Sequence, residues 1–380
     1  MYPEIQSYIT ENRQGLFDLL EELVLIQSYS RNKAGVDRVG KRIQKEMAGM
    51  GFSCEFKHQD TLGDHLIARS PGCSTGKKQI LITGHMDTVF PEDTRFNWYK
   101  ENATMCFGPG VADMKGGLVV GIYALKALIH AGKIDNHPIT FLFNSDEEIG
   151  SPTSRALIRE EANRSRAAFV LEAGGLSDKI VVGRKGNLSA RLSVSGKAGH
   201  AAFAGRDKAS AILALAHKII ALEKMNAPDK GISANVGTIS GGIGPNTVPD
   251  LATAALDFRF PTDDDAQEIK SQLHRIAGHQ TIPGTGAEVD IVSGRPAMPE
   301  TPENQVLFNQ IRELADRLGM PVTREVRQGV SDANIIAAQG IPVIDGLGPV
   351  GDKDHSEDEY IEKESLWKRS ILFGNILAGI

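Results

Sequence analysis

The sequence predicts an α/β fold in which a central, mostly parallel sheet is interrupted by a smaller inserted α+β domain. In the first and last parts of the chain, helical patterns alternate with short apolar strands. Those strands, such as QILIT at 79–83 and ITFLFN at 139–144, are continuously apolar, which is typical of strands buried on both faces. The strands in the middle of the chain instead alternate apolar and polar residues, as in a sheet with one solvated face.

The first part of the chain supplies most of the predicted central sheet. Apolar residues at helical spacing indicate helices, glycines such as Gly51 and Gly132 mark helix ends, and compact apolar runs indicate strands. In order, we expect helices at 3–27 and 35–50, strands near 52–57, 64–69 and 79–83, and a Gly-rich turn at 116–117 that leads into a helix at 118–132. A strand at 139–144, a helix near 152–161 and a strand at 167–172 follow.

The middle of the chain has its own order of elements. We expect a strand at 187–196, a helix at 207–225, strands at 232–242 and 248–260, a helix at 263–278 and a strand at 287–294. This β-α-β-β-α-β order is the ferredoxin-like signature. The helix–strand alternation then returns, with a helix at 302–318, a short helix after Ser331, a strand at 342–345 and a final helix from about 363. The predicted domains are therefore 1–180 with 295–380, and the insertion 181–294.

Composition excludes several classes of partner. A net charge of −6 gives no basic field for nucleic acid or an anionic membrane. The N-terminal MYPEIQSYITENRQG lacks the regions of a secretory leader, and no apolar run approaches the roughly 18 residues of a membrane span. The cysteines, Cys54, Cys73 and Cys106, are odd in number and form no CxxC pair, so we expect reduced thiols in a cytoplasmic protein.

A histidine and an aspartate follow the strand QILIT in the motif GHMDT. His85 and Asp87 are two residues apart, so on extended backbone both side chains lie on one face. The aspartate can then accept the free ring N–H of a metal-bound histidine. The alternative is a loop histidine hydrogen-bonded to a turn aspartate.

A second candidate is Asp113 in GPGVADMKGG, just before a glycine turn and a helix. Glycines at such a turn can bind phosphate. Here the spacing matches neither the Walker pattern nor GxGxxG, and an aspartate disfavours an anion site. A tight turn and a ligand-binding loop both remain open.

Acids and a second histidine complete the set of candidates. NSDEEIGS places Asp146, Glu147 and Glu148 at the end of an apolar strand, and Glu172 ends another. His355 lies in DKDHSEDEY near the C-terminus. Taken singly, these residues could be ordinary loop acids and a solvated surface run.

Together these motifs predict a metal site. Active sites of open α/β sheets form outside the carboxyl ends of the strands, where these side chains emerge. Two histidines with three or four carboxylates suit zinc or cobalt, and one carboxylate can bridge two ions. No cysteine occurs in these motifs, which argues against a structural zinc site.

GHMD, GPGVADMKGG, NSDEEIGS, the strand-end glutamate, the insertion and DHSED together resemble the aminoacylase/glutamate carboxypeptidase family of dinuclear zinc hydrolases, above all its carboxypeptidase G-like branch. The resemblance covers nearly the whole chain. It implies a zinc-peptidase-like catalytic domain and an inserted domain that acts as a lid and dimerises. It also implies two Zn²⁺ ions per subunit, which Co²⁺ or Mn²⁺ can replace, and a cis peptide bond after Asp113.

The resemblance assigns roles residue by residue. It makes Glu147 the general base that activates a metal-bridging water, and Asp87 the residue that orients His85. Asp146 is left without a role, since alternation along the strand sends it to the face opposite Glu147. The implied metal ligands are His85 and Glu172 for one zinc, Glu148 and His355 for the other, and Asp113 as the bridge between them.

The inserted domain carries family motifs as well. His200 in SGKAGHAA resembles the lid histidine that reaches a partner subunit's active site and stabilises the oxyanion. Asn246 in GGIGPNTVPD and Arg259 in DFRF resemble residues that hold the substrate carboxylate, for which an arginine fork is suited. Further candidates are Arg184, Lys179 and Gly329, for which the alternatives are surface cations and a turn glycine.

These implications lead to a functional expectation. We expect a zinc-dependent exopeptidase or amidohydrolase that cleaves an amide next to a free carboxylate, with a C-terminal glutamate as the released residue. The alternative within the same chemistry is an N-acyl-amino-acid deacylase of the acetylornithine or succinyl-diaminopimelate type. From other classes, the alternatives are a catalytically inactive metal-binding relative and a nucleotide-binding α/β protein.

Overall fold

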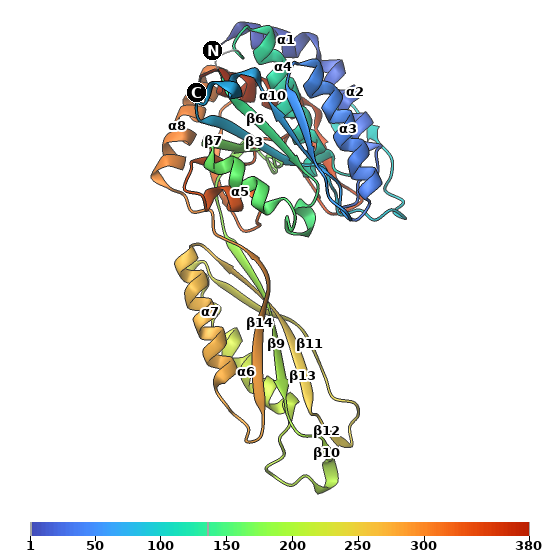
Figure 1. Ribbon diagram of the computed structural model, residues 1–380, viewed down its shortest axis with the longest axis vertical. Coiled ribbons are helices and arrows are strands. Elements are labelled where there is room, and N and C mark those ends of the chain that lie inside the picture. The colour runs from blue at the N-terminus through green and yellow to red at the C-terminus, as the bar shows by residue number, and fades with distance from the viewer. Residues whose placement is uncertain (1, 135–136, 380) are drawn as a thin grey trace. The chain divides into compact units, whose positions relative to one another are not determined.

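A six-stranded sheet forms the centre of the part of the molecule that contains both chain ends (Figure 1). The structure is a computed structural model that describes residues 2–134 and 137–379. Within it the chain forms two compact units. The first comprises the chain up to Gly183, Glu300–Val326 and the chain from Ser331; the second comprises Arg184–Pro299 and Arg327–Val330.

The central sheet is mostly parallel, as predicted. In spatial order its strands are β1 (Ser53–Lys57), β2 (His65–Arg69), β6 (Ile139–Asn144), β3 (Gln79–His85), β7 (Ser165–Val170) and β16 (Val343–Ile344). The strands β6, β3, β7 and β16 run parallel to one another, while β2 and β1 add an antiparallel edge. Because the parallel strands are buried on both faces, they show the continuously apolar pattern read from the sequence.

Helices cover both faces of this sheet. They are α1 (Pro3–Glu11), α2 (Arg13–Val24), α3 (Lys33–Gly49), α4 (Gly116–His130), α5 (Arg155–Asn163), α8 (Pro302–Arg317), α9 (Asp332–Ala337) and α10 (Lys363–Gly379). The helices α4 and α10 pack together in one large core, and α5 lies on the opposite face of the sheet (Figure 1). The short helix α9 packs against α5. Buried nearly all round, α4 approaches the sheet closely at Gly121, where a Cβ would lie 2.6 Å from Phe141.

The helix predicted at 3–27 is wrong in one respect, because the chain forms two helices that meet at Asn12. The side-chain amide of Asn12 donates to the carbonyl oxygen of Tyr8 at 2.8 Å, and its backbone leaves the helical region. Asparagine competes for backbone hydrogen bonds in this way, so a continuous apolar pattern does not guarantee a continuous helix.

Short strands that the sequence pattern did not predict bring the C-terminal segment to the loop before α4. They include β4 (Lys100–Glu101), β5 (Met105–Phe107), β17 (Gly351–Asp352) and β18 (Tyr360–Glu362), which form a sheet in the order β17-β18-β5-β4. Because β18 pairs with β5, residues just before Tyr360 lie beside residues just after Phe107. These strands are only two or three residues long, too short for alternation to be recognised.

The second unit has the ferredoxin-like architecture predicted for the insertion. Its elements in chain order are β9 (Gly186–Ser195), α6 (Ala211–Glu223), β11 (Ser233–Gly241), β13 (Leu251–Phe260), α7 (Asp263–Gly278) and β14 (Gly286–Arg295). The sheet is antiparallel, in the order β11-β13-β9-β14, and both helices pack on one face of it (Figure 1). Two further short strands, β10 (Gly199–His200) and β12 (Thr247–Val248), pair with each other.

All three cysteines are free thiols, as predicted. Among the described residues, none of the helices combines the length and apolar character needed to cross a membrane.

Candidate metal centre

The parallel strands β3, β6 and β7 deliver the candidate ligands of the first unit to one edge of the sheet. His85 is the last residue of β3, Glu147 and Glu148 follow β6, and Glu172 follows β7. Because these three strands are neighbours and parallel, their carboxyl ends lie at the same edge. Asp113, from the loop before α4, joins them there.

Asp113 lies between the two histidines and offers a different oxygen to each. His85 Nε2 is 3.0 Å from Asp113 Oδ1, and His355 Nε2 is 3.3 Å from Asp113 Oδ2. The remaining acids divide in the same way, with Glu172 Oε1 3.8 Å from His85 Nε2 and Glu148 Oε2 3.2 Å from His355 Nε2. The structure thus brings together all five residues that the resemblance makes metal ligands. The peptide bond between Asp113 and Met114 is cis, as the resemblance implies.

The carboxylates of this cluster need positive charge. Burial raises the pKa of Glu148 to about 8, and the charge of Asp113 adds to the rise. Burial and then Asp113 also raise the pKa of Glu172 well above its usual range. One oxygen of Glu148, Oε1, is buried and has no hydrogen-bond partner among the described residues. An unpartnered buried carboxylate oxygen is costly unless a cation or a proton accompanies it.

The two histidines, when protonated, supply part of this positive charge. Hydrogen bonds to Asp113 and Glu148 raise the pKa of His355 to about 11. Burial would lower the pKa of His85, but hydrogen bonds to Asp113 and Asp87 raise it well above its usual range. The same two histidines hold the pKa of Asp113 low in spite of its burial. Protons on these groups occupy the role that a divalent cation takes in a carboxylate–imidazole site, so the donor set fits a metal such as zinc.

His85 is oriented by Asp87, though chiefly through the backbone. Its Nδ1 lies 2.9 Å from the carbonyl oxygen of Asp87 and 3.4 Å from the carboxylate Oδ1. With a proton held on Nδ1 by these acceptors, Nε2, the ring nitrogen that faces Asp113, is the one that would bind a metal in place of its own proton. The expected carboxylate contact is therefore the longer of the two.

The carboxylate of Asp87 has other partners. It accepts hydrogen bonds from the backbone N–H groups of Glu147 (3.2 Å) and Glu148 (3.3 Å), and from Ser30 Oγ (2.7 Å). Asp87 is fully buried, so these donors offset the loss of water around its charge. One residue thereby ties the histidine at the end of β3 to the two glutamates after β6.

Asp146 and Glu148, two of the three adjacent acids of NSDEEIGS, have different surroundings. Asp146 is fully buried and accepts hydrogen bonds from the backbone N–H and hydroxyl groups of Thr153 (2.6 and 2.7 Å) and of Ser154 (3.2 and 2.5 Å). These donors lie just before α5. Asp146 thus anchors the turn, while Glu148 points to His355.

Two acidic residues of the C-terminal segment that the sequence did not predict also lie at this site. Asp354, Asp113 and His355 form one group whose ligand atoms all lie within 4.8 Å, and His85, Asp113 and Glu148 form another. Glu359 is fully buried and binds the backbone around Asp113. The only signal for either was membership of the acidic run DKDHSEDEY, which is equally typical of a solvated surface.

In the second unit the structure brings His200 and Asn246 together. The strand pair β10–β12 sets His200 opposite Thr247, and the N–H of Ala201 donates to the carbonyl oxygen of Asn246 at 2.9 Å. Arg259 lies on β13, where its Nε and Nη2 donate to the carboxylate of Asp257 (2.9 and 3.4 Å).

The remaining substrate-binding candidates lie elsewhere. In the second unit, the guanidinium of the buried Arg184 donates to the carbonyl oxygen of Gly329 at 3.0 Å. Lys179 belongs to the first unit, where its Nζ lies 3.5 Å from Glu325 Oε1.

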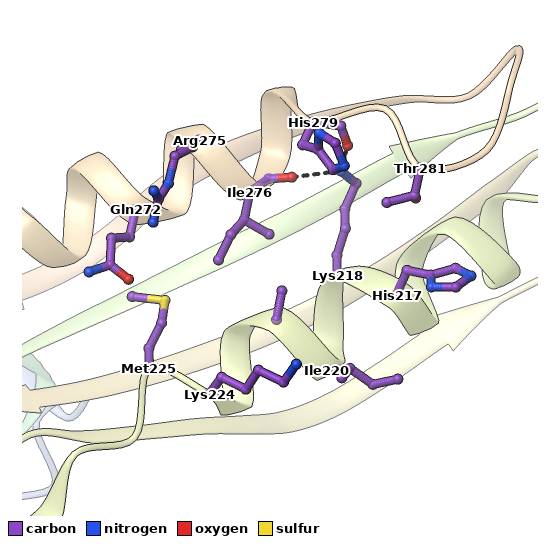
Figure 2. Close-up of a pocket in the computed structure, with 11 residues that line it drawn as sticks. His217, Lys218, Ile220, Lys224, Met225, Gln272, Arg275, Ile276, His279 and Thr281 are labelled. Carbon is purple, nitrogen blue, oxygen red and sulfur yellow. Dashed lines mark hydrogen bonds between the residues drawn. The ribbon is translucent and has the colours of Figure 1, made fainter.

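A groove of about 610 Å³ lies between α6 and α7 of the second unit (Figure 2). Its basic lining residues are His217, Lys218, Lys224, Arg275 and His279. The buried ammonium of Lys218 donates three hydrogen bonds to carbonyl oxygens at the end of α7, those of Ile276 (2.7 Å), Ala277 (3.0 Å) and His279 (2.8 Å). Lys218 therefore caps the C-terminus of α7 by pairing with carbonyl oxygens that the helix leaves without partners. None of the predicted site residues lines the groove.

Comparison with known proteins identifies the family. Residues 81–378 match peptidase family M20/M25/M40, and the chain belongs to this family. Carboxypeptidase G2 from Pseudomonas sp. (strain RS-16) is 28% identical over 377 residues, covering 97% of this chain and 90% of its own. Succinyl-diaminopimelate desuccinylase from Psychrobacter arcticus is 27% identical over 395 residues, covering 97% and 95%. The protein is thus a hydrolase of the metallopeptidase and amidohydrolase type.

Solved structures share the whole fold. Aminopeptidase PepT from Bacillus cereus has a TM-score of 0.80 at 25% identity, covering 97% of this chain and 98% of its own. The M20 family metallo-carboxypeptidase Sso-CP2 from Sulfolobus solfataricus has a TM-score of 0.76 at 19% identity, covering 96% and 98%. The fold class predicted from the sequence is therefore confirmed.

The surroundings of Asp146 predict a purely structural role. In Asp146→Asn an amide N–H₂ would replace one acceptor oxygen, so the free energy of unfolding of the metal-free protein should fall by about 1.5–3 kcal/mol. Urea denaturation measures it, with the matched change Asp60→Asn at an exposed position as the control. An unchanged unfolding midpoint, together with lost metal binding, would assign Asp146 to the metal centre instead.

Proposed function

We propose that this protein is a dinuclear zinc exopeptidase or amidohydrolase that cleaves an amide bond next to a free carboxylate, most similar in specificity to glutamate carboxypeptidases. The observation that carries the proposal is the position of Asp113 between two histidine–glutamate pairs. One carboxylate that faces two separate donor pairs suits a pair of bridged ions better than a single ion.

The proposed ligands are those predicted from the sequence. His85 and Glu172 would hold one zinc and Glu148 and His355 the other, with Asp113 as the ligand that both would share. When bound, the ions would polarise the scissile carbonyl and acidify water. Co²⁺ or Mn²⁺ could replace zinc, since the donor set is one of imidazole and carboxylate.

Glu147 is the proposed general base. Its backbone N–H is held by Asp87, whose own carbonyl oxygen orients His85, so the base and a metal ligand share one support. Glu147 takes a proton from the attacking water and delivers it to the leaving nitrogen. Glu147 and Glu148 are adjacent in the chain. In this proposal Glu148 binds metal and Glu147 transfers the proton.

Substrate recognition is assigned to the second unit. Arg259 and Asn246 are proposed to hold the free carboxylate, and His200 to stabilise the oxyanion in the partner subunit of a homodimer. Asp257 engages Nε and Nη2 of Arg259, which fixes the plane of the guanidinium and leaves Nη1 for a ligand. Arg184, Lys179 and Gly329 remain further candidates for substrate contacts.

The homodimer is proposed to form through residues 181–294, acting as the lid and dimerisation domain. The strand β11 is an edge of its sheet and carries the exposed Ile239. The neighbouring helix α6 exposes further apolar side chains, those of Ile212, Leu213 and Ile220. An open strand edge beside exposed apolar residues suits pairing with a second copy of the chain. A cytoplasmic location is proposed from the three free thiols.

A desuccinylase of the succinyl-diaminopimelate type is the second candidate. Its support is the 27% identity to the enzyme of that name over nearly the whole chain. Both candidates use the same proposed ligands and base, so substrate preference alone separates them.

Glu147→Ala should abolish turnover and leave metal binding intact, because it removes the base and no proposed ligand. We expect kcat to fall by a factor of at least about 10². Steady-state kinetics and metal analysis of the purified protein measure both quantities, with Glu160→Ala on the exposed face of α5 as the control. A variant that remains active would refute this mechanism.

A substrate panel distinguishes the two candidate functions. The zinc-loaded protein should hydrolyse peptides and N-acyl compounds that end in glutamate faster than N-succinyl or N-acetyl diamino acids. Preference for N-succinyl substrates would favour the desuccinylase.

Arg259→Met should raise KM for the carboxylate-bearing substrates by about 10²-fold, since a charged hydrogen-bonding partner is lost.

Mixing variants tests whether subunits share an active site. A His200→Ala chain and a Glu147→Ala chain, each inactive alone, should recover part of the wild-type activity after they are unfolded and refolded together. Recovery is expected because a mixed dimer retains one site with both residues. If no activity returns although mixed dimers form, each site is complete within one chain.

A further inference from the structure

The fully buried carboxylate of Glu359 binds the loop that carries Asp113. Its Oε2 accepts a hydrogen bond from the N–H of Gly110 at 2.9 Å. Its Oε1 accepts two more, from the N–H of Ala112 at 2.8 Å and from the N–H of Asp113 itself at 2.9 Å. Three backbone donors of a single short loop therefore converge on one side chain.

Hydrogen bonds within the loop fix part of its conformation: the N–H of Val111 donates to the carbonyl oxygen of Gly108 at 3.1 Å, and the N–H of Lys115 to that of Gly110 at 2.7 Å. Gly108 and Gly110 both have positive φ angles, of 154° and 79°, which other residues rarely adopt. Asp113 itself has non-helical backbone angles (φ −117°, ψ 91°), and hydrogen bonds from outside the loop hold this conformation. The three bonds to Glu359 do this at the residue whose carboxylate lies between the two histidines.

Glu359 also belongs to the segment that supplies the second histidine. It follows His355 by four residues and immediately precedes β18, which pairs with β5 on the other side of the loop. The N–H of Glu359 in turn donates to the carbonyl oxygen of Ser356 at 3.3 Å. One side chain thus links the His355 segment to the backbone of Asp113, and these two ligands are 3.3 Å apart.

We propose that Glu359 is a positioning residue that fixes Asp113 relative to His355 and thereby sets the affinity of the metal centre. The inference rests on the metal centre of the proposed function. Glu359 is not among the proposed ligands and acts through the backbone of Asp113. Because the side chain of Asp113 is short, its two oxygens can face both histidines only when its backbone is held in place.

The chemistry of the contact explains why a carboxylate is needed there. Both oxygens of Glu359 accept, and each faces at least one N–H. In Glu359→Gln one oxygen becomes an N–H₂ group. Its hydrogens then face a backbone N–H, so two hydrogen-bond donors oppose each other with no acceptor between them. At least one of the three bonds is lost, and the loop moves away from the opposing donor.

The test is zinc affinity measured by competition with a chromophoric chelator, together with steady-state kinetics. Wild-type protein and the variants are stripped of metal by dialysis and titrated with Zn²⁺. Glu359→Gln should bind Zn²⁺ about 10–100-fold more weakly, the usual effect of removing a partner that orients a ligand. At saturating Zn²⁺ its KM should match that of the wild type, since no proposed substrate contact has changed. Glu357→Gln, the same change at an exposed position two residues away, should bind as the wild type does.

The outcomes separate this inference from the proposed function. Wild-type protein that binds no Zn²⁺ would overturn the metal centre, and the role of Glu359 with it. Wild-type protein that binds two equivalents, beside a Glu359→Gln variant of equal affinity, would overturn the role of Glu359 alone. Glu359→Asp covers the case in which Glu359→Gln does not fold, because it keeps the charge but shortens the side chain. Its Zn²⁺ affinity should be reduced, and a wild-type value would again refute the proposal.

Discussion

Carboxylates that are buried close together repel one another. In the first unit this repulsion determines the surroundings of the residues at the end of the central sheet. Asp113, Glu148 and Glu172 converge on two histidines at the end of the central sheet. Burial, and after it the charge of Asp113, raises the pKa of the two glutamates, so the cluster is stable only with positive charge among them. A fold that brings these carboxylates together therefore favours the binding of a cation at this edge of the sheet.

Backbone N–H groups provide the other source of compensation. Asp87, Asp146 and Glu359 are fully buried and lie around the ligands. Each accepts hydrogen bonds from the backbone of a different segment: the turn after β6, the turn before α5 and the loop before α4. These hydrogen bonds offset part of the cost of burying the three acids, and they hold the segments on which the proposed ligands lie. Acidic residues of one chemical type thus have two separate functions, decided by whether an N–H or a cation faces them.

The sequence predicted much of this arrangement, because long apolar strands and the residues at their ends are local patterns. His85, Glu148 and Glu172 could be placed at one edge once their strands were taken as parallel. The break at Asn12 and the short strand β18 could not be predicted, since one side-chain hydrogen bond decides the first and a distant partner strand decides the second. Glu359 was hidden for the same reason, because a buried glutamate and a solvated one are identical within the run DKDHSEDEY.

The pairing of β18 with β5 has a consequence for how the molecule matures. Asp113 and His355 are separated by most of the chain, including the entire second unit, yet their side chains are in contact. During synthesis on the ribosome, all strands of the second unit are made before His355, while the donor set of the first unit stays incomplete until His355 has been added. A chain that ends before His355 therefore lacks the residue that faces Asp113 and Glu148, and with it part of the proposed metal site.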